Sequence, residues 1–283
     1  MSVPKRHHYV PQMLLNGFTD SEGWLHWCRP SDRPVTVRRA RPPELFHQNH
    51  LYSTLSDTGT KDPAMEHALS ILESEAAGVV QSILLPARAG KLPALTHEQK
   101  LLWYTFFLTQ WRRTPETQRA NVSDAEALRM IEETLDELRQ VAPHRANEIE
   151  ALATPEAKAR TMRNVRVQTI GQQPSVELMR VLQRRGIAIL RIAQPNKRFI
   201  IGSRPVVKLT TQNSTDLNDL TVEMWLPLAS DVAVGVGQGD GNVSLHHTVD
   251  ERPVRQLNIA IARQSGTIAA ASGALVKSIA DTR

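Results

Sequence analysis

The feature that most constrains the fold is a predicted helix that is apolar on almost every side. Thr96-His97-Glu98-Gln99 has the form of a capping box, which marks where this helix begins. The apolar residues that follow are Leu101, Leu102, Trp103, Tyr104, Phe106, Phe107, Leu108 and Trp111. A helix without a polar face must be covered all round by other parts of the chain. We therefore expect it to form the buried centre of a helical layer.

Further helices are predicted on both sides of it in the sequence. Asp62 caps a helix whose first position is Pro63. The apolar stripe of that helix consists of Met65, Leu69, Leu72, Val79 and Ile83. Three more helices begin at Ser123, at Thr154-Pro155 and at Pro174-Ser175. These three are either scaffold or a dimer surface.

The chain changes from helix to strand at Gly186. The runs 187–192 and 198–201 have strand composition, and the turn residues between them indicate a hairpin. Two more strands are predicted at 221–226 and 232–236, then a helix at 250–264 and a closing strand at 267–271. Together with the helices, this predicts an α+β fold in which a helical middle layer packs on a small, mainly antiparallel C-terminal sheet. A strand at 23–28 is expected to join that sheet.

No stretch of the sequence has the character of a linker. We therefore predict that residues 1–283 form a single compact domain with two lobes. The first lobe, 1–185, is expected to be mainly helical, and the second, 186–283, mainly β with one helix.

The composition is typical of a soluble globular protein. Apolar residues make up 41% of the chain and charged residues 22%. The single cysteine, Cys28, excludes an internal disulfide framework and a cysteine-based zinc cluster. The sequence has no apolar run close to the ~20 residues of a membrane span, and its N-terminus lacks the apolar core of a secretory signal. We expect a cytoplasmic protein that has no membrane partner.

Charge is distributed unevenly in the second lobe. Residues 180–208 carry eight Lys or Arg and no acid, whereas residues 209–251 carry seven acids and no Lys or Arg. This asymmetry fits a phosphate-rich partner such as a nucleic acid. It fits equally well two surfaces of one protein that pair with each other.

The N-terminal stretch holds the strongest candidate site. Lys5, Arg6, His7 and His8 stand just before Pro11, which is predicted to open a short helix ending at Gly17. A helix N-terminus favours negative charge and lowers a histidine pKa, so neutral imidazoles are expected, as bases or metal ligands. If this piece is instead a strand, His7 and His8 face opposite ways and only one points into any given pocket.

The same stretch resembles a known family. His7-His8-Tyr9-Val10-Pro11-Gln12, followed by Leu15, Phe18 and a Gly-led aromatic strand at 23–27, is similar to the opening of domain-of-unknown-function family 4238. Further similarities are Leu51-Tyr52, Gln110 to Pro115 and Pro227-Leu228. Members tend to carry Ser-Asp-x-Pro after a strand, whereas this chain has Ser203-Arg204-Pro205, which lacks the acid and is one residue shorter. The resemblance implies no particular reaction.

Other polar residues complete the predicted site. Arg113 ends the apolar helix, where the helix dipole favours a cation, and the same rigid position suits a bidentate clamp on a phosphate or carboxylate. Glu66 and Glu73 are seven residues apart on one side of their helix, as solvated residues or as a pair for metal binding or acid–base work. The predicted catalytic residues are His7, His8, Arg113 and Glu73. The predicted substrate-binding residues are Lys5, Gln12, Asn16, Arg112, Ser203 and Arg204.

Three classes of function fit these residues. The first is a phosphodiester-cleaving enzyme, such as a nuclease used in phage conflict or as a toxin, with or without a divalent metal ion. The second is a non-catalytic binder of nucleic acid or nucleotide that uses the basic segment 180–208. The third is a protein-interaction module in which the N-terminal motif only pins the chain to the core. The sequence predicts no oligomeric state.

Overall fold

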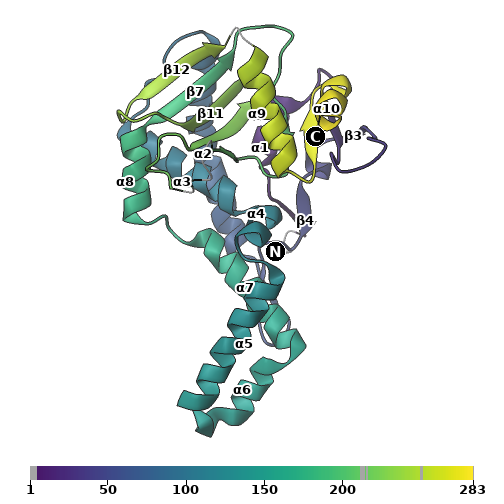
Figure 1. Cartoon of the computed structure of the whole chain (residues 1–283), viewed down its shortest axis with the longest axis vertical. Coiled ribbons are helices and arrows are strands. Elements are labelled where there is room, and N and C mark those ends of the chain that lie inside the picture. Colours follow the sequence, from purple (N-terminus) through teal and green to yellow (C-terminus); the bar gives the residue numbers. More distant parts are fainter. Residues whose placement is uncertain (1–4, 211–213, 215, 249–250, 283) are drawn as a thin grey trace.

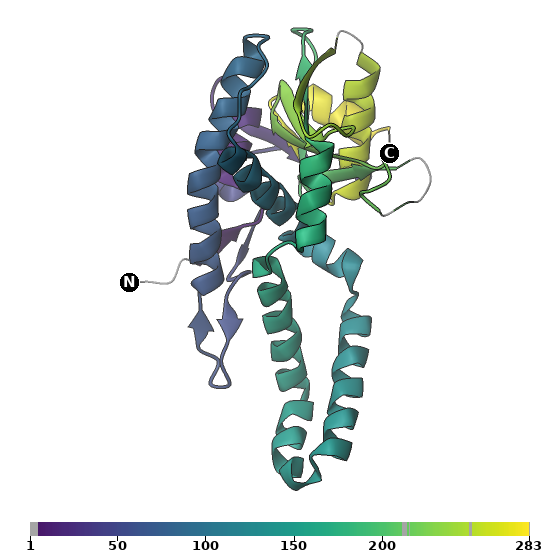
Figure 2. The same cartoon turned by 90° about the vertical axis from the view of Figure 1, so that its left-hand side faces the viewer.

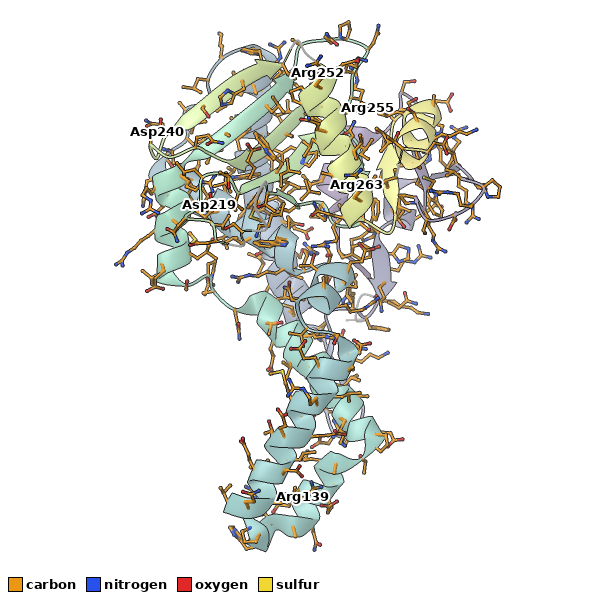
Figure 3. The ribbon with its side chains drawn as sticks, in the orientation of Figure 1. Arg139, Asp219, Asp240, Arg252, Arg255 and Arg263 are labelled. Atoms are coloured by element: carbon orange, nitrogen blue, oxygen red, sulfur yellow. The ribbon has the colours of Figure 1, made fainter. Side chains whose placement is uncertain are left out.

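A computed structural model describes residues 5–210, 214, 216–248 and 251–282 of the chain (Figure 1). A body of mixed helix and sheet carries one helical arm that projects from it. The arm consists of α5 (Asp124–Val141), α6 (Ala146–Ala153) and α7 (Pro155–Gly171), with α6 at its free end (Figure 2). Arg139 bonds Glu150 of α6 near this end (Figure 3), which ties the tip together. The fold is α+β, as predicted.

The apolar helix lies in the body as expected. Thr96 caps α3 (His97–Arg112) by accepting a hydrogen bond from the Gln99 N–H. Trp103, Phe106 and Phe107 are buried, and α3 packs on α2 (Ala64–Arg88). The capping box therefore predicted the start of α3, and the lack of a polar face predicted its burial.

Helix α2 is the one helix in the described part of the chain that is long and apolar enough, by length and composition alone, to cross a membrane. A core helix of a soluble protein meets the same criterion, and α2 packs on α3, β7 and β11. The expectations of a cytoplasmic location and of no membrane partner stay predictions.

The larger sheet has five strands in the order β12-β7-β11-β10-β9. These are β7 (Ile187–Ile192), β9 (Val207–Leu209), β10 (Glu223–Ala229), β11 (Val232–Val236) and β12 (Val243–Thr248). All neighbours are antiparallel except β12 and β7. Helix α2 covers one face and α9 (Glu251–Gln264) the other (Figure 2), which explains why β11 is buried along its whole length.

The predicted hairpin between 187–192 and 198–201 is wrong. Both edges of β7 are taken by β11 and β12, so the following strand cannot pair with it. Strand β8 (Ile201–Gly202) instead joins a second, four-stranded sheet in the order β3-β2-β13-β8, built with β2 (Leu25–Cys28), β3 (Arg38–Ala40) and β13 (Ile268–Ala270). The predicted strand at 23–28 does join C-terminal strands, as its pairing with β13 confirms.

Several elements of the described chain were not predicted. The second lobe has a second helix, α10 (Gly273–Ala280), capped by Ser272, so the expectation of one helix there is wrong. Its burial against β2 and β13, rather than its own short sequence, favours helix. Strand β12 and helix α6 were also missed. The first residue of the helix predicted at 250–264 lies outside the described residues.

The remaining elements surround the N-terminal motif and the base of the arm. They are β1 (Arg6–His8), α1 (Gln12–Leu15), β4 (His47–Asn49), β5 (Thr54–Leu55), β6 (Lys61–Asp62), α4 (Pro115–Asn121) and α8 (Val176–Arg185). Short 3-10 turns lie at Asn16–Phe18, Pro42–Glu44 and Pro143–Arg145. The division into two lobes stays a prediction.

Some of the basic residues of the segment 180–208 bond to residues of the segment 209–251. Arg185 is buried and donates to the carbonyl oxygens of four residues, Leu217, Asp219, Val222 and Gly237. Lys197 forms an ion pair with Glu251. Burial lowers the pKa of Arg185, and the negative charges of Glu223 and Asp219 oppose this shift. Asp219 lies at the edge of the body beside α8 (Figure 3). The basic segment therefore offers fewer free cations than its sequence suggests.

Candidate functional site

The two histidines of the motif lie on a strand and face opposite ways. β1 pairs with β4 in antiparallel register, with His7 opposite Gln48. His7 is fully buried, whereas His8 is half-buried. The strand alternative is thus confirmed, and Pro11 caps α1 rather than occupying its first helical position.

His7 is held beside a carboxyl group of α2. Its Nδ1 accepts a hydrogen bond of 3.0 Å from the Tyr52 N–H, and its ring stacks on that of Tyr52 with centroids 5.8 Å apart. Glu66 Oε2 lies 3.5 Å from the same Nδ1 and has no hydrogen-bond partner, although it is buried. Because Nδ1 already accepts the Tyr52 proton, a charged Glu66 would place two lone pairs face to face.

Glu66 is accordingly predisposed to hold a proton. Burial raises the pKa of its carboxyl group to about 7; the nearby Arg113 lowers it in part and Glu73 raises it further. The side chain as a whole is 22% exposed. One oxygen therefore points inward at His7, while part of the group remains open to solvent.

Arg113 joins three parts of the chain behind this pair. Its Nε donates to the Tyr52 hydroxyl at 3.1 Å, one terminal nitrogen pairs with Glu73, and the other donates to the carbonyl oxygen of His8. The Tyr52 hydroxyl in turn donates to the Arg113 carbonyl at 3.1 Å. The pairing raises the pKa of Arg113 despite its burial, so it stays charged. At 1% exposure it cannot reach a bound substrate.

His8 and its neighbours form the outer side of the ribbon. The His8 Nε2–H donates to the Pro43 carbonyl at 3.2 Å, and the Gln12 amide lies 3.5 Å from Nδ1. Burial lowers the pKa of His8, with smaller contributions from His47, Arg113 and Arg6 and an opposing one from the bond to Pro43. The expected neutral imidazole is thus favoured, but burial rather than a helix N-terminus is the main cause.

Cations surround the ribbon on the side of His50, whose ring packs on that of His7 at 6.0 Å between centroids. Burial is the first cause that lowers the pKa of His50, and the positive charges of Lys5, Lys61 and Arg163 add to it. Lys5 and Lys61 are exposed, while Arg163 donates to the carbonyl oxygens of His50 and Ser53. The Glu66–His7 pair therefore lies next to a positively charged rim.

A second polar cluster lies just beyond the end of α3. Ser203 is buried, with its hydroxyl 2.7 and 2.8 Å from the two oxygens of Glu116 in the first turn of α4. The same hydroxyl accepts the N–H groups of Gly266 and Thr267 at 3.1 and 3.2 Å. The negative charge of Glu116 also raises the pKa of Tyr9, after burial as the main cause, so this cluster borders the N-terminal motif.

The structure brings some predicted site residues together and separates others. His7, His8, Arg113 and Glu73 meet in one network, with Lys5 and Gln12 at its margin. Ser203 is saturated by internal bonds, and Arg204 beside it is half-buried with an unpartnered Nε. Asn16 is exposed at the end of α1, and Arg112 turns toward α7, where it donates to the Gln172 carbonyl.

Sequence reasoning gave no role to Tyr52 and missed Glu116. Tyr52 stood in one of the family motifs, which was its only signal. Glu116 directly follows Thr114-Pro115, a helix start in which an acid is expected for the dipole alone. Among the described residues, no group of three or more His, Cys, Asp or Glu side chains converges as metal ligands would.

Of the comparisons with known proteins, the one with family models found a match. Neither the proteins of curated function nor the solved structures include a match to this chain. The family model described as a protein of unknown function (DUF4238) matches residues 6–272. The match covers the His7-His8 motif, Tyr52, Arg113 and Ser203, and so includes both polar clusters. The chain belongs to the DUF4238 family.

Proposed function

We propose that the protein hydrolyses phosphodiester bonds, with Glu66 as the acid–base group and His7 as the residue that positions it. The observation that carries the proposal is the contact of 3.5 Å between the buried Glu66 Oε2 and His7 Nδ1, in a network whose two carboxylate side chains are both partly exposed. A carboxyl group in that position costs stability, because its ionised form is poorly compensated. Costly polar groups of this kind are concentrated at functional sites.

The chemistry requires a base that is partly ionised near neutral pH. A pKa of about 7 gives Glu66 both forms under such conditions. In the proposed step, ionised Glu66 takes a proton from a water molecule, whose oxygen forms a bond to phosphorus as the bond to the leaving oxygen breaks. The leaving oxygen takes a proton from solvent, and Glu66 releases its proton to solvent.

The surrounding charges support a phosphate substrate. Lys5, Lys61 and Arg163 lie near His50, and Arg6 acts electrostatically on His8 and His47. A rim of this sign beside a catalytic carboxylate attracts a polyanion that the carboxylate alone would repel. The predicted role of Arg113 changes accordingly. Its contacts with Glu73, Tyr52 and His8 suit a positioning residue that aligns β1 and α2, rather than a phosphate clamp.

The test compares Glu66→Gln with Glu75→Gln, a substitution of an exposed glutamate on the same helix. The substrates are bis(4-nitrophenyl) phosphate and end-labelled single- and double-stranded DNA and RNA, with and without Mg²⁺. We expect Glu66→Gln to lower kcat/KM at least 100-fold without lowering the melting temperature. The rate of the unsubstituted protein should rise as pH increases through about 7. If the two variants turn over the substrates at equal rates, Glu66 has no role in the chemistry.

A second function, a protein-interaction module, is favoured by one observation. The bond from Arg113 to the His8 carbonyl pins β1 to the core without any need for catalysis. Substituting His7 cannot separate the two functions, because His7 is fully buried and its loss costs stability in either case. If no substrate is turned over and Glu66→Gln behaves like Glu75→Gln, the interaction module is the better description.

A further inference from the structure

The projecting arm contains a large hollow whose lining does not include the residues of the His7 network. It has a volume of about 780 Å³, within the range of small-molecule sites, and lies between α5 and α7. Its apolar lining is formed by Ala127, Met130, Ile131, Leu135, Leu138, Leu152, Met162 and Val165. Several of these are open to solvent: Met130 is 51% exposed and Val165 50%.

The hollow is polar at one end and mainly apolar along the rest of its length, where Thr134 and Thr161 are among the lining residues. Arg112, Gln118, Asn121, Arg166 and Gln172 line it where the arm meets the body. The apolar wall then follows α5 from Ala127 to Leu138 toward the tip, near which Arg139 lies (Figure 3). The eleven helical steps from Ala127 to Leu138, at about 1.5 Å each, give this wall a length of about 16 Å. The shape fits a long apolar chain with a polar head at the base of the arm.

The charged side chains at the base of the arm determine which charge a bound head group should carry. Arg166 is already paired with Asp124 at 2.7 Å and donates to the Val122 carbonyl. Arg112, in contrast, donates to the Gln172 carbonyl at 3.1 Å, and within the described part of the chain no carboxylate lies within 4.0 Å of it. Half-buried without a counter-ion, its guanidinium has donors suited to a carboxylate. Arg112 therefore has the charge and the donors that an anionic head group would accept from.

We propose that this hollow binds a single-chain amphiphile with an anionic head, a long-chain fatty carboxylate. The carboxylate accepts from Arg112, and the chain lies between α5 and α7, covering side chains that are otherwise exposed. The proposal is independent of the hydrolytic function, because Arg112 turns toward the arm while Arg113 turns toward the histidines. It also gives a ligand to Arg112, one of the predicted substrate-binding residues that lie outside the His7 network.

The head group is tested by calorimetric titration with hexadecanoate below its critical micelle concentration, and with hexadecan-1-ol as the neutral match. The variants are Arg112→Gln and, as control, Arg119→Gln, an exposed arginine of α4 outside the lining. We expect hexadecanoate to bind Arg112→Gln about tenfold or more weakly, the loss of one charge-assisted hydrogen bond. Arg119→Gln should bind as the unsubstituted protein does. Equal affinities for acid and alcohol, or no effect of Arg112→Gln, would overturn the proposal.

The chain-binding part is tested by filling the hollow. Met130→Trp should abolish binding, whereas Leu128→Trp, at a 37% exposed position of α5 outside the lining, should not. Sedimentation of the same variants examines the alternative occupant, a second copy of the arm. A dimer that Met130→Trp dissociates, in a protein that takes up no hexadecanoate, would overturn the proposal and make this face a subunit interface.

Discussion

Replacing Glu66 by glutamine should change how stability depends on pH. The folded protein holds a proton on Glu66 up to about pH 7, whereas the unfolded chain releases it near its ordinary pKa of 4.5. A carboxyl group whose pKa is higher in the folded protein than in the unfolded chain stabilises the folded protein at low pH. This stabilisation is lost as pH rises. The unsubstituted protein should therefore lose stability between about pH 4.5 and pH 7, and glutamine, which has no proton to lose, should not.

The size of the effect follows from the pKa. Moving it from 4.5 to about 7 corresponds to about 3 kcal/mol, at about 1.4 kcal/mol for each tenfold change in proton affinity. Because the side chain is 22% exposed, solvent screening reduces this to about 1.5 kcal/mol. For a protein of this size, the melting temperature of Glu66→Gln relative to that of the unsubstituted protein should then rise by about 3 °C at pH 8.5.

The assay is thermal unfolding, followed by circular dichroism, of both proteins from pH 5 to pH 8.5. The difference between the two melting temperatures is the quantity of interest, since the titration of His8, His47 and His50 affects both proteins and cancels. Glu75→Gln supplies the control, because its exposed side chain makes no comparable contact. A difference that stays constant across this range would show that Glu66 is ionised in the folded protein, and the reasoning about its base strength would fail.

Substitutions at three further positions test the polar clusters. Arg113→Lys should destabilise by about 3 kcal/mol in urea unfolding, because lysine cannot bond Tyr52, Glu73 and the His8 carbonyl together; unchanged stability would make the network dispensable. Tyr52→Phe removes only the hydrogen bonds of the hydroxyl group and should lower the free energy of unfolding by about 1 kcal/mol in the same measurement. A larger loss of stability in Tyr52→Phe than in Arg113→Lys would contradict this expectation. Ser203→Ala leaves buried N–H groups and the Glu116 carboxylate without their partner and should cost about 2 kcal/mol, whereas Ser203→Thr should cost less if the hydroxyl is what matters.

The sequence alone determined the features that depend on near neighbours in the chain. Thr96 caps α3 through a residue three positions away, and Ser123 and Thr154 cap α5 and α7 in the same way. The apolar residues on almost every side of α3 predicted its burial. The opposite directions of the His7 and His8 side chains followed once that segment was interpreted as a strand. Such features need only local backbone geometry and a helix or strand period, which a sequence displays directly.

Only the tertiary structure decided which polar groups meet. His7 meets Tyr52 from 45 positions away, and Ser203 meets Glu116 from 87. It also decided that Arg113 is a buried connector rather than a phosphate clamp. The pairing of strands and the burial of side chains depend on how distant segments pack, and no periodicity within either segment specifies its partner. The sequence could therefore name His7, Glu73 and Arg113 as one site, but their roles followed from the contacts that packing imposes on them.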